Sequence, residues 1–182
     1  VKAGDNMHRV EINAGRWVDE NKNVIYGFTK GDANNKGESI QVSWDKRNDP
    51  EIIEKMAGWK VFTVDTETYN HRKELEEKLK DATEKDEIAE ELEKSKKKRK
   101  EFLHASDFID YLVKVLDNEK SKDMVFHVTG NLDFAYSEKN GLYYRTFTPQ
   151  KITRVPDNTK QICEGSMKVY FSENAVDDTM TD

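Results

Sequence analysis

The residue types best suited to binding chemistry gather in one segment, residues 125–155. It carries four basic side chains and two acidic ones, so it is net +2 in a chain that is net -6. Its aromatic residues are Phe126, Phe134, Tyr136, Tyr143, Tyr144 and Phe147, and its basic residues are Lys139, Arg145, Lys151 and Arg154. Aromatic faces that stack on bases, beside cations that contact phosphates, are the means by which proteins hold single-stranded nucleic acid with little sequence preference. The segment therefore indicates a nucleic-acid-binding surface.

The same segment has the pattern of a long β-hairpin. Polar and apolar residues alternate on both sides of Asn140-Gly141, a dipeptide suited to the positive φ angles of a two-residue type I′ turn. We therefore predict two strands that meet at this dipeptide. Since alternate side chains lie on opposite faces of a strand, only one parity of each strand can face a ligand.

Parity narrows the candidates for stacking. Leu132, Phe134 and Tyr136 share a face of the first strand, and we expect Phe134 to belong to the core, whereas Tyr136 is left open between core and surface. Tyr143 shares a face of the second strand with Arg145, a charged residue that indicates an accessible face. Trp17 beside Arg16, and Trp44 near Lys46 and Arg47, repeat the pairing of an aromatic residue with a base elsewhere, although aromatic residues in strands are more often core. The predicted nucleic-acid contacts are Trp17, Trp44, Lys46, Arg47, Tyr136, Lys139, Tyr143, Arg145 and Lys151.

These side chains need a scaffold, and the rest of the sequence predicts one that is mainly β with some α. Strand patterns occur around residues 10–18, 24–30, 39–44 and 59–65, and a short amphipathic segment at 50–57 follows Asp49, a plausible helix cap. Glycine and proline are absent from 59–129, which favours helix with a strand at each margin. Residues 69–100 read as a charged helix with a narrow leucine seam, and a capping pattern at 83–86 leaves open its division into a helical hairpin. A more apolar helix is expected at 107–116.

The order of several strands, a helical region and a final hairpin is that of the five-stranded OB barrel. We therefore expect residues 1–66 and 107–160 to form an OB-like domain. Residues 67–106 then form a long charged helical insertion between strands 3 and 4, and residues 161–182 form an extra strand and an acidic tail.

A family resemblance rests on short motifs. The sequence VTGNL at 128–132, followed by NG at 140–141 and YRTF at 144–147, resembles the last two strands of single-stranded-DNA-binding proteins of the bacterial and phage type. FIDYL at 108–112 and WKVF at 59–62 are similar to the helix and the earlier strand of that family. The resemblance implies an OB fold that binds single-stranded DNA in replication or recombination, alongside proteins of those processes, in a bacterial or infected-host cytoplasm.

Other classes of function find little support in the sequence. The pairs Asp45-Lys46 and Asp65-x-Glu67 could be imagined in a metal-dependent nuclease, but a chain with 36% charged residues produces such pairs by chance. Cys163 is the single cysteine, which excludes an intramolecular disulfide and fits a reducing cytosol. No apolar run is long enough to cross a membrane. We expect neither catalysis nor a cofactor.

Two features leave alternatives open. The basic run KSKKKRK at 94–100 follows an acidic stretch, an order that favours a solvated helix face over a nucleic-acid contact or localisation signal. The same barrel could also serve as a protein-interaction module whose helical insertion binds a protein partner, without affinity for nucleic acid. Homo-oligomerisation is compatible with either hypothesis.

Overall fold

The computed structural model describes residues 2–3, 6–7, 12, 23–81, 85–166 and 168. It divides the chain into two compact units, residues 1–9 with 160–182, and residues 10–159. In the first unit, strands β1 (Lys2–Ala3) and β2 (Asn6–Met7) pair in antiparallel orientation. The strand expected around residues 10–18, including Trp17, lies outside the described residues apart from Ile12. Most of the strand and tail expected at 161–182 lies outside them as well.

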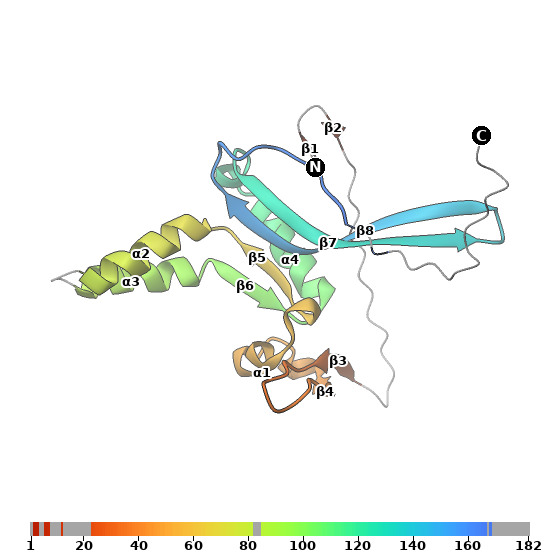
Figure 1. Cartoon of the computed structure of the whole chain (residues 1–182), viewed down its shortest axis with the longest axis horizontal. Helices are drawn as coiled ribbons and strands as arrows, with labels where there is room; N and C mark the ends of the chain where they lie inside the picture. Colours follow the sequence, from red (N-terminus) through yellow and green to blue (C-terminus); the bar gives the residue numbers. More distant parts are fainter. Residues whose placement is uncertain are drawn as a thin grey trace. The chain divides into compact units, whose positions relative to one another are not determined.

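The larger unit is built around a four-stranded sheet of order β6-β5-β8-β7 (Figure 1). Its strands are β5 (Phe62–Asp65), β6 (Arg99–Phe102), β7 (Val125–Ser137) and β8 (Leu142–Val155). Strand β5 pairs with β6, and β7 pairs with β8, in antiparallel orientation. The two inner strands, β5 and β8, are parallel to each other, and Val64 lies opposite Ile152. The predicted hairpin at 125–155 is confirmed, and so is a strand at the end of the 59–65 segment.

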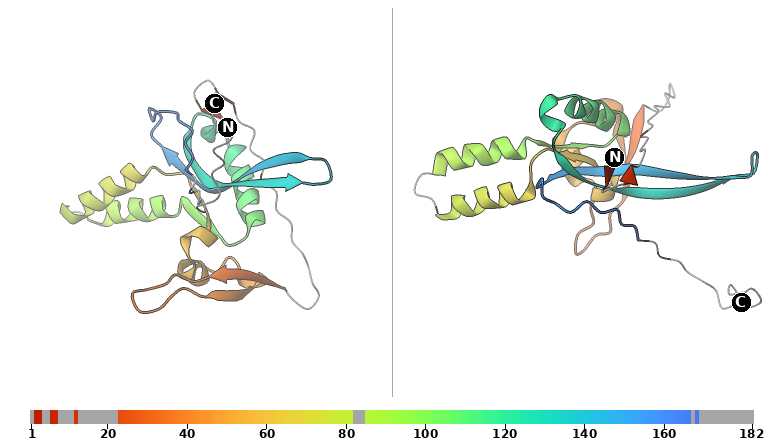
Figure 2. Two further views of the ribbon diagram at one scale, coloured as in Figure 1. Left: turned by 45° about the vertical axis from the view of Figure 1, so that its right-hand side comes forward. Right: turned by 90° about the horizontal axis from the view of Figure 1, so that it is seen from above.

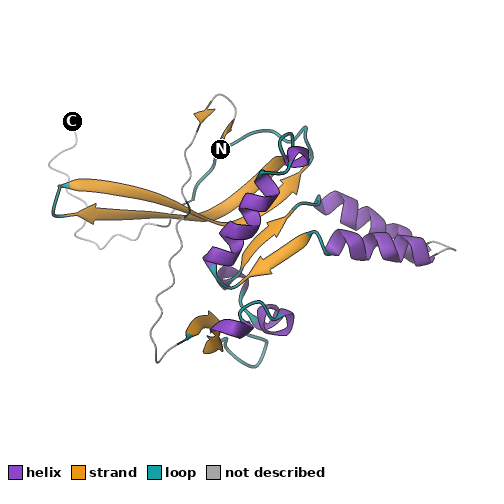
Figure 3. Cartoon of the chain, turned by 180° about the vertical axis from the view of Figure 1, so that it is seen from behind, coloured by secondary structure: helices purple, strands orange, loops and turns teal. Residues whose placement is uncertain are grey.

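Helix α4 (Ala105–Leu116) covers one face of this sheet (Figure 3). Phe108 and Leu112 on its apolar side pack against Val64 and Ile152, and Phe108 and Val64 are fully buried. The imidazole of His104 caps the helix by accepting a hydrogen bond from the Ser106 backbone N–H at 3.2 Å. The helix predicted at 107–116 is thus confirmed, with its first turn two residues earlier.

A two-stranded antiparallel sheet, β3 (Val24–Phe28) and β4 (Ser39–Ser43), lies next to a second core. Short helices follow it: the 3₁₀ helix η1 (Trp44–Lys46), helix α1 (Pro50–Lys55) and the 3₁₀ helix η2 (Gly58–Lys60). The predicted cap is confirmed, since the Asp49 carboxylate accepts a hydrogen bond from the Glu51 N–H at 3.0 Å. The buried members of this core are Val42, Ile53, Met56, Val61 and Leu103.

The charged insertion contains a helical hairpin of α2 (Tyr69–Asp81) and α3 (Lys85–Lys96). The division that the sequence left open is therefore present, although residues 82–84 are not described. Leu75 and Leu92 from the seam are buried. The chain then leaves the helix and forms β6, so the basic run at 94–100 is helical only up to Lys96. Residues 99–102 are a strand where the sequence predicted the helical insertion to continue.

Two ion pairs tie the helical hairpin to β5. Arg72 of α2 donates two hydrogen bonds to the buried carboxylate of Asp65, at 2.5 and 2.7 Å. Lys98 donates to the buried carboxylate of Glu67 at 2.7 Å. These pairs join the end of β5 to α2 and to the segment after α3, so they fix the point at which the insertion leaves the sheet.

The fold is mixed α/β. Among the described residues, no strand pairing joins the β3–β4 sheet to the four-stranded sheet, and no closed barrel is formed. No helix in the described part of the chain has the length and apolar character needed to span a membrane. A short 3₁₀ helix, η3 (Glu119–Ser121), precedes β7.

The tip and the middle of the β7–β8 hairpin differ from a regular ladder. Four residues, 138–141, connect Ser137 to its partner Leu142, and Gly141 alone of the described residues has a positive φ, at 66°. The two-residue type I′ turn predicted at Asn140-Gly141 is therefore wrong, because Asn140 does not adopt the positive φ that such a turn needs. Further along, Thr129 pairs with Lys151 but Gly130 pairs with Pro149, so Gln150 is the extra residue of a β-bulge.

We predict that Gly130→Ala destabilises the fold while Gly58→Ala does not. A Cβ at Gly130 would collide with the Thr148 carbonyl oxygen and lie 2.8 Å from the Pro149 Cα, whereas a Cβ at Gly58 meets nothing within 4 Å. The expected loss of unfolding free energy for Gly130→Ala is about 1–3 kcal/mol, as for overpacked sites. Urea denaturation of both variants measures it, and equal stabilities would contradict the close approach at the bulge.

We also predict that stability depends on the ionisation of Glu67. Burial raises the pKa of Glu67, but the hydrogen bonds from Lys98 and the Thr68 backbone N–H, together with the charges of Lys98 and His71, outweigh it, so the pKa lies below the ordinary value of 4.5. A carboxyl group whose pKa is lower in the folded state than in the unfolded state stabilises the fold fully above the unfolded-state pKa. This stabilisation is lost as the pH falls through the folded-state pKa. Between about pH 5 and pH 3, the unfolding free energy of Glu67→Gln should therefore fall less steeply than that of the wild type. Glu54→Gln, at an exposed site on α1, is the control and should keep the wild-type dependence. Parallel curves for Glu67→Gln and the wild type would remove this role of Glu67.

Candidate nucleic-acid interface

The outer half of the β7–β8 hairpin extends beyond the sheet as a two-stranded arm, residues 131–148 (Figures 1 and 2). Within the described residues, β5 pairs with β8 only at residues 151–153, so the arm has no third strand. The arm begins at the bulge, where the ladder changes register between Thr129 and Gly130. Among the described strands, the two strands of the arm pair only with each other.

One face of the arm carries a row of exposed aromatic and aliphatic side chains, which we call the aromatic face. The register pairs Leu132 with Phe147, Phe134 with Arg145, and Tyr136 with Tyr143. Side chains of directly opposed residues lie on the same face, so these six share one surface. The exposed fractions are 56% for Leu132, 58% for Phe134, 55% for Tyr136 and 76% for Tyr143. These residues are not core in the described part of the chain.

The aromatic face continues the face of the sheet that α4 covers. Along β7, Phe126 and Val128 pack against the α4 core, and the same parity leads through Gly130 to Leu132, Phe134 and Tyr136. The alternation of large apolar residues therefore continues along β7 beyond the part of the strand that α4 covers. A row of large apolar side chains with exposed fractions above one half is a common sign of a binding surface.

The tip of the arm is ordered by local contacts. The rings of Tyr136 and Tyr143 are 4.8 Å apart, inclined at 43°. The Gly141 N–H donates to the Ser137 carbonyl oxygen at 2.9 Å, and the Asn140 amide donates to the Tyr144 hydroxyl at 2.5 Å on the opposite face. The two tyrosines of the aromatic face are thus held as a pair.

Two cations of the arm, Arg145 and Lys139, are open to an anion, while the arm as a whole is neutral because it also carries Asp133 and Glu138. In the described part of the chain, no carboxylate lies within ion-pair distance of Arg145, Lys139 or Lys151. Arg145 lies within the aromatic row and Lys139 in the tip loop, both exposed. The acidic Asp133 has the opposite parity from the row and lies on the other face. A phosphate could therefore reach both cations without displacing a protein partner.

The predicted contacts away from the arm lie elsewhere. Trp44 is half-buried in η1, where its ring is 4.9 Å from the His104 ring and 4.1 Å from the Arg47 guanidinium. Arg47 donates to Asp107 at 2.7 and 3.0 Å. Burial raises the pKa of Asp107, but the hydrogen bonds and charge of Arg47, with smaller contributions from Asn48 and His104, outweigh it and the pKa is lowered. Trp44 and Arg47 thus join η1 to α4, and neither is gathered onto the arm.

Of the remaining predicted contacts, Lys46 is exposed on η1, and Lys151 is exposed on β8 just inside the bulge. Lys151 pairs with Thr129, on the face opposite to α4. Trp17 is outside the described residues. The structure therefore brings together Tyr136, Lys139, Tyr143 and Arg145 from the predicted set.

The prediction that Phe134 belongs to the core is wrong, because the arm leaves the sheet before this residue. Leu132, Phe134 and Phe147 are the members of the aromatic face that are absent from the predicted contacts. The sequence signal that could have identified Phe134 is its parity, which places it on the same face of the strand as Tyr136. In the structure, Phe134 lies opposite the charged Arg145, as expected for an accessible face.

Comparison with known proteins gives no family assignment: neither a family model nor a curated protein nor a solved structure matches this chain. Among the described residues, there is no group of three or more His, Cys, Asp or Glu side chains that could hold a metal ion.

Proposed function

We propose that this protein binds single-stranded DNA, largely without sequence specificity, through the aromatic face of the arm. The observation that carries the proposal is an exposed row of aromatic side chains that includes Arg145, which has no carboxylate within ion-pair distance among the described residues. This combination provides both stacking surfaces and a phosphate contact, the two components of non-specific single-strand binding.

The spacing of the row supports stacking. Alternate residues on one strand are about 6.6–6.8 Å apart along the strand, which is twice the 3.4 Å repeat of stacked bases. Side chains stand roughly perpendicular to a sheet, so rings of Phe134 and Tyr136 that lie across the strand would be separated by the thickness of one stacked base. Each base stacked in this way contributes about 1–3 kcal/mol.

From the sequence resemblance, we also propose that the protein acts in DNA replication or recombination in a phage or a bacterium. We propose a cytoplasmic location and no catalytic activity. We further propose that residues 1–66 and 107–160 form an OB-related domain. The parallel β5–β8 pair and the α4 crossover between β6 and β7 support a barrel-like topology. The helical hairpin α2–α3 is then an insertion, available to replication or recombination proteins or to a second copy of the chain.

A titration with fluorescein-labelled oligo-dT tests the proposal directly. We expect fluorescence anisotropy to rise on addition of the protein, with an affinity that falls as salt increases. The slope of log affinity against log salt should be about -0.7 for each phosphate neutralised. Absence of binding at low salt would remove the proposal and leave the protein-interaction module as the better hypothesis.

Substitutions on the arm locate the site. Tyr143→Ala should weaken oligo-dT binding by about 1–3 kcal/mol, because one stacking ring is lost. Arg145→Ala should also weaken binding and should make the salt slope shallower, because one cation that neutralises a phosphate is lost. Both residues are exposed and far from the core, so circular dichroism should show intact folding. Tyr69→Ala is the matched control, because Tyr69 is 70% exposed but lies on α2. Wild-type affinity in both arm variants would move the site elsewhere.

A further inference from the structure

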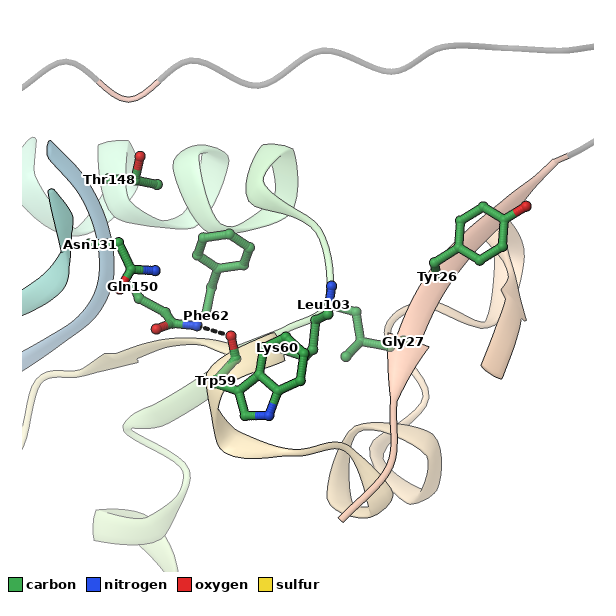
Figure 4. Close-up of a pocket in the computed structure, with 9 residues that line it drawn as sticks. All are labelled: Tyr26, Gly27, Trp59, Lys60, Phe62, Leu103, Asn131, Thr148 and Gln150. Carbon is green, nitrogen blue, oxygen red and sulfur yellow. Dashed lines mark hydrogen bonds between the residues drawn. The ribbon is translucent and has the colours of Figure 1, made fainter. Parts of the chain in front are cut away.

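A pocket of about 350 Å³ lies at the base of the arm, where three segments of the larger unit meet (Figure 4). The β3 strand contributes Tyr26, residues 59–62 contribute an indole, a lysine and a phenyl ring, and the arm base contributes Asn131, Thr148 and Gln150. A volume of this size is at the lower end of the range for small-ligand sites.

The lining divides into an apolar wall and a polar rim. Trp59, Phe62 and Leu103 form the apolar part, and the side-chain amides of Asn131 and Gln150 are able to meet the polar edge of a flat ring. Lys60, whose ammonium lies 5.0 Å from the centre of the Trp59 ring, adds a cation. In the described part of the chain, Lys60 has no carboxylate within ion-pair distance.

The central residue of the pocket is both exposed and held in place. Trp59 is 58% exposed, and its ring packs at 5.2 Å from the ring of Phe28. Its carbonyl oxygen accepts a hydrogen bond from the side chain of Gln150, the extra residue of the bulge. The bulge that begins the arm therefore also holds the backbone of Trp59, while Phe28 supports its ring. A supported aromatic ring with a large exposed fraction is suited to stacking.

We propose that this pocket binds one nucleotide, with its base against Trp59 and its phosphate beside Lys60. The inference rests on the proposed function in that the nucleotide is taken to belong to the bound single strand. A free mononucleotide offers the same chemistry, so the experiment separates the two sources.

The test uses Trp59 as its own reporter. The chain has three tryptophans, so Trp17→Phe combined with Trp44→Phe leaves Trp59 as the sole indole. Oligo-dT should quench its emission in step with the anisotropy rise of a labelled oligonucleotide. If both oligo-dT and dTMP quench the emission, the pocket binds a nucleotide whether it is free or within a strand. If oligo-dT quenches and dTMP does not, the pocket binds a nucleotide only within a strand.

Affinity measurements in the otherwise wild-type chain do not depend on the double variant. Trp59→Ala should weaken oligo-dT binding by between about fivefold and a hundredfold, the loss of one stacked base. Lys60→Gln should make the salt slope shallower by about 0.7, whereas Lys36→Gln, which removes an exposed lysine outside the pocket, should leave the slope unchanged.

The outcomes separate the two proposals. If the wild type binds oligo-dT while Trp59→Ala and Lys60→Gln keep wild-type affinity and salt dependence, the pocket inference is overturned and binding by the arm stands. If the wild type binds neither oligo-dT nor dTMP, both proposals fail.

Discussion

The burial of α4 against β5 and β8 is the interaction on which the rest of the structure depends. Val64 and Phe108 have no exposed surface, and Ile152 joins them from β8. This small core fixes the inner end of β8 beside β5, and because β8 is a single strand of fourteen residues, it also fixes the direction in which the arm leaves. The arm is therefore an extension of a strand whose other half is anchored.

The bulge at Gln150 divides those two roles. Inside it, Ile152 is buried under α4; outside it, Phe147 and Tyr143 belong to the aromatic face. Gly130 makes the division possible, because a side chain there would strike the opposite strand. The bulge also directs the Gln150 amide towards Trp59. One irregularity in the ladder thus ends the core, begins the arm and supports the pocket.

Much of this architecture could be predicted from local patterns. The hairpin, α1 with its Asp49 cap, α4 and the two-helix insertion all follow from periodicity and capping, which act over a few residues. Strand β6 could not be predicted, because Arg99–Phe102 lacks alternation and forms a strand through its pairing with β5.

The site was predicted only in part for the same reason. Tyr143 and Arg145 follow from composition and parity, but the exposure of Phe134 depends on where α4 stops covering the sheet, a tertiary property. Trp44 and Arg47 show the converse, since their pairing of an aromatic residue with a base joins η1 to α4 through Asp107.

The length of the arm has a consequence for long-range electrostatics. Its seven residues from Asn131 to Ser137 span about 23 Å at the rise of a strand. The register also places the arm and α2 at opposite ends of the sheet, because Thr63 of β5 lies opposite Lys151 while Asp65, which leads to α2, lies opposite Thr153. At physiological salt the Debye length is about 8 Å, so the tip is more than two screening lengths from the sheet. The carboxylates of α2 should therefore do little to repel a polyanion that approaches the tip.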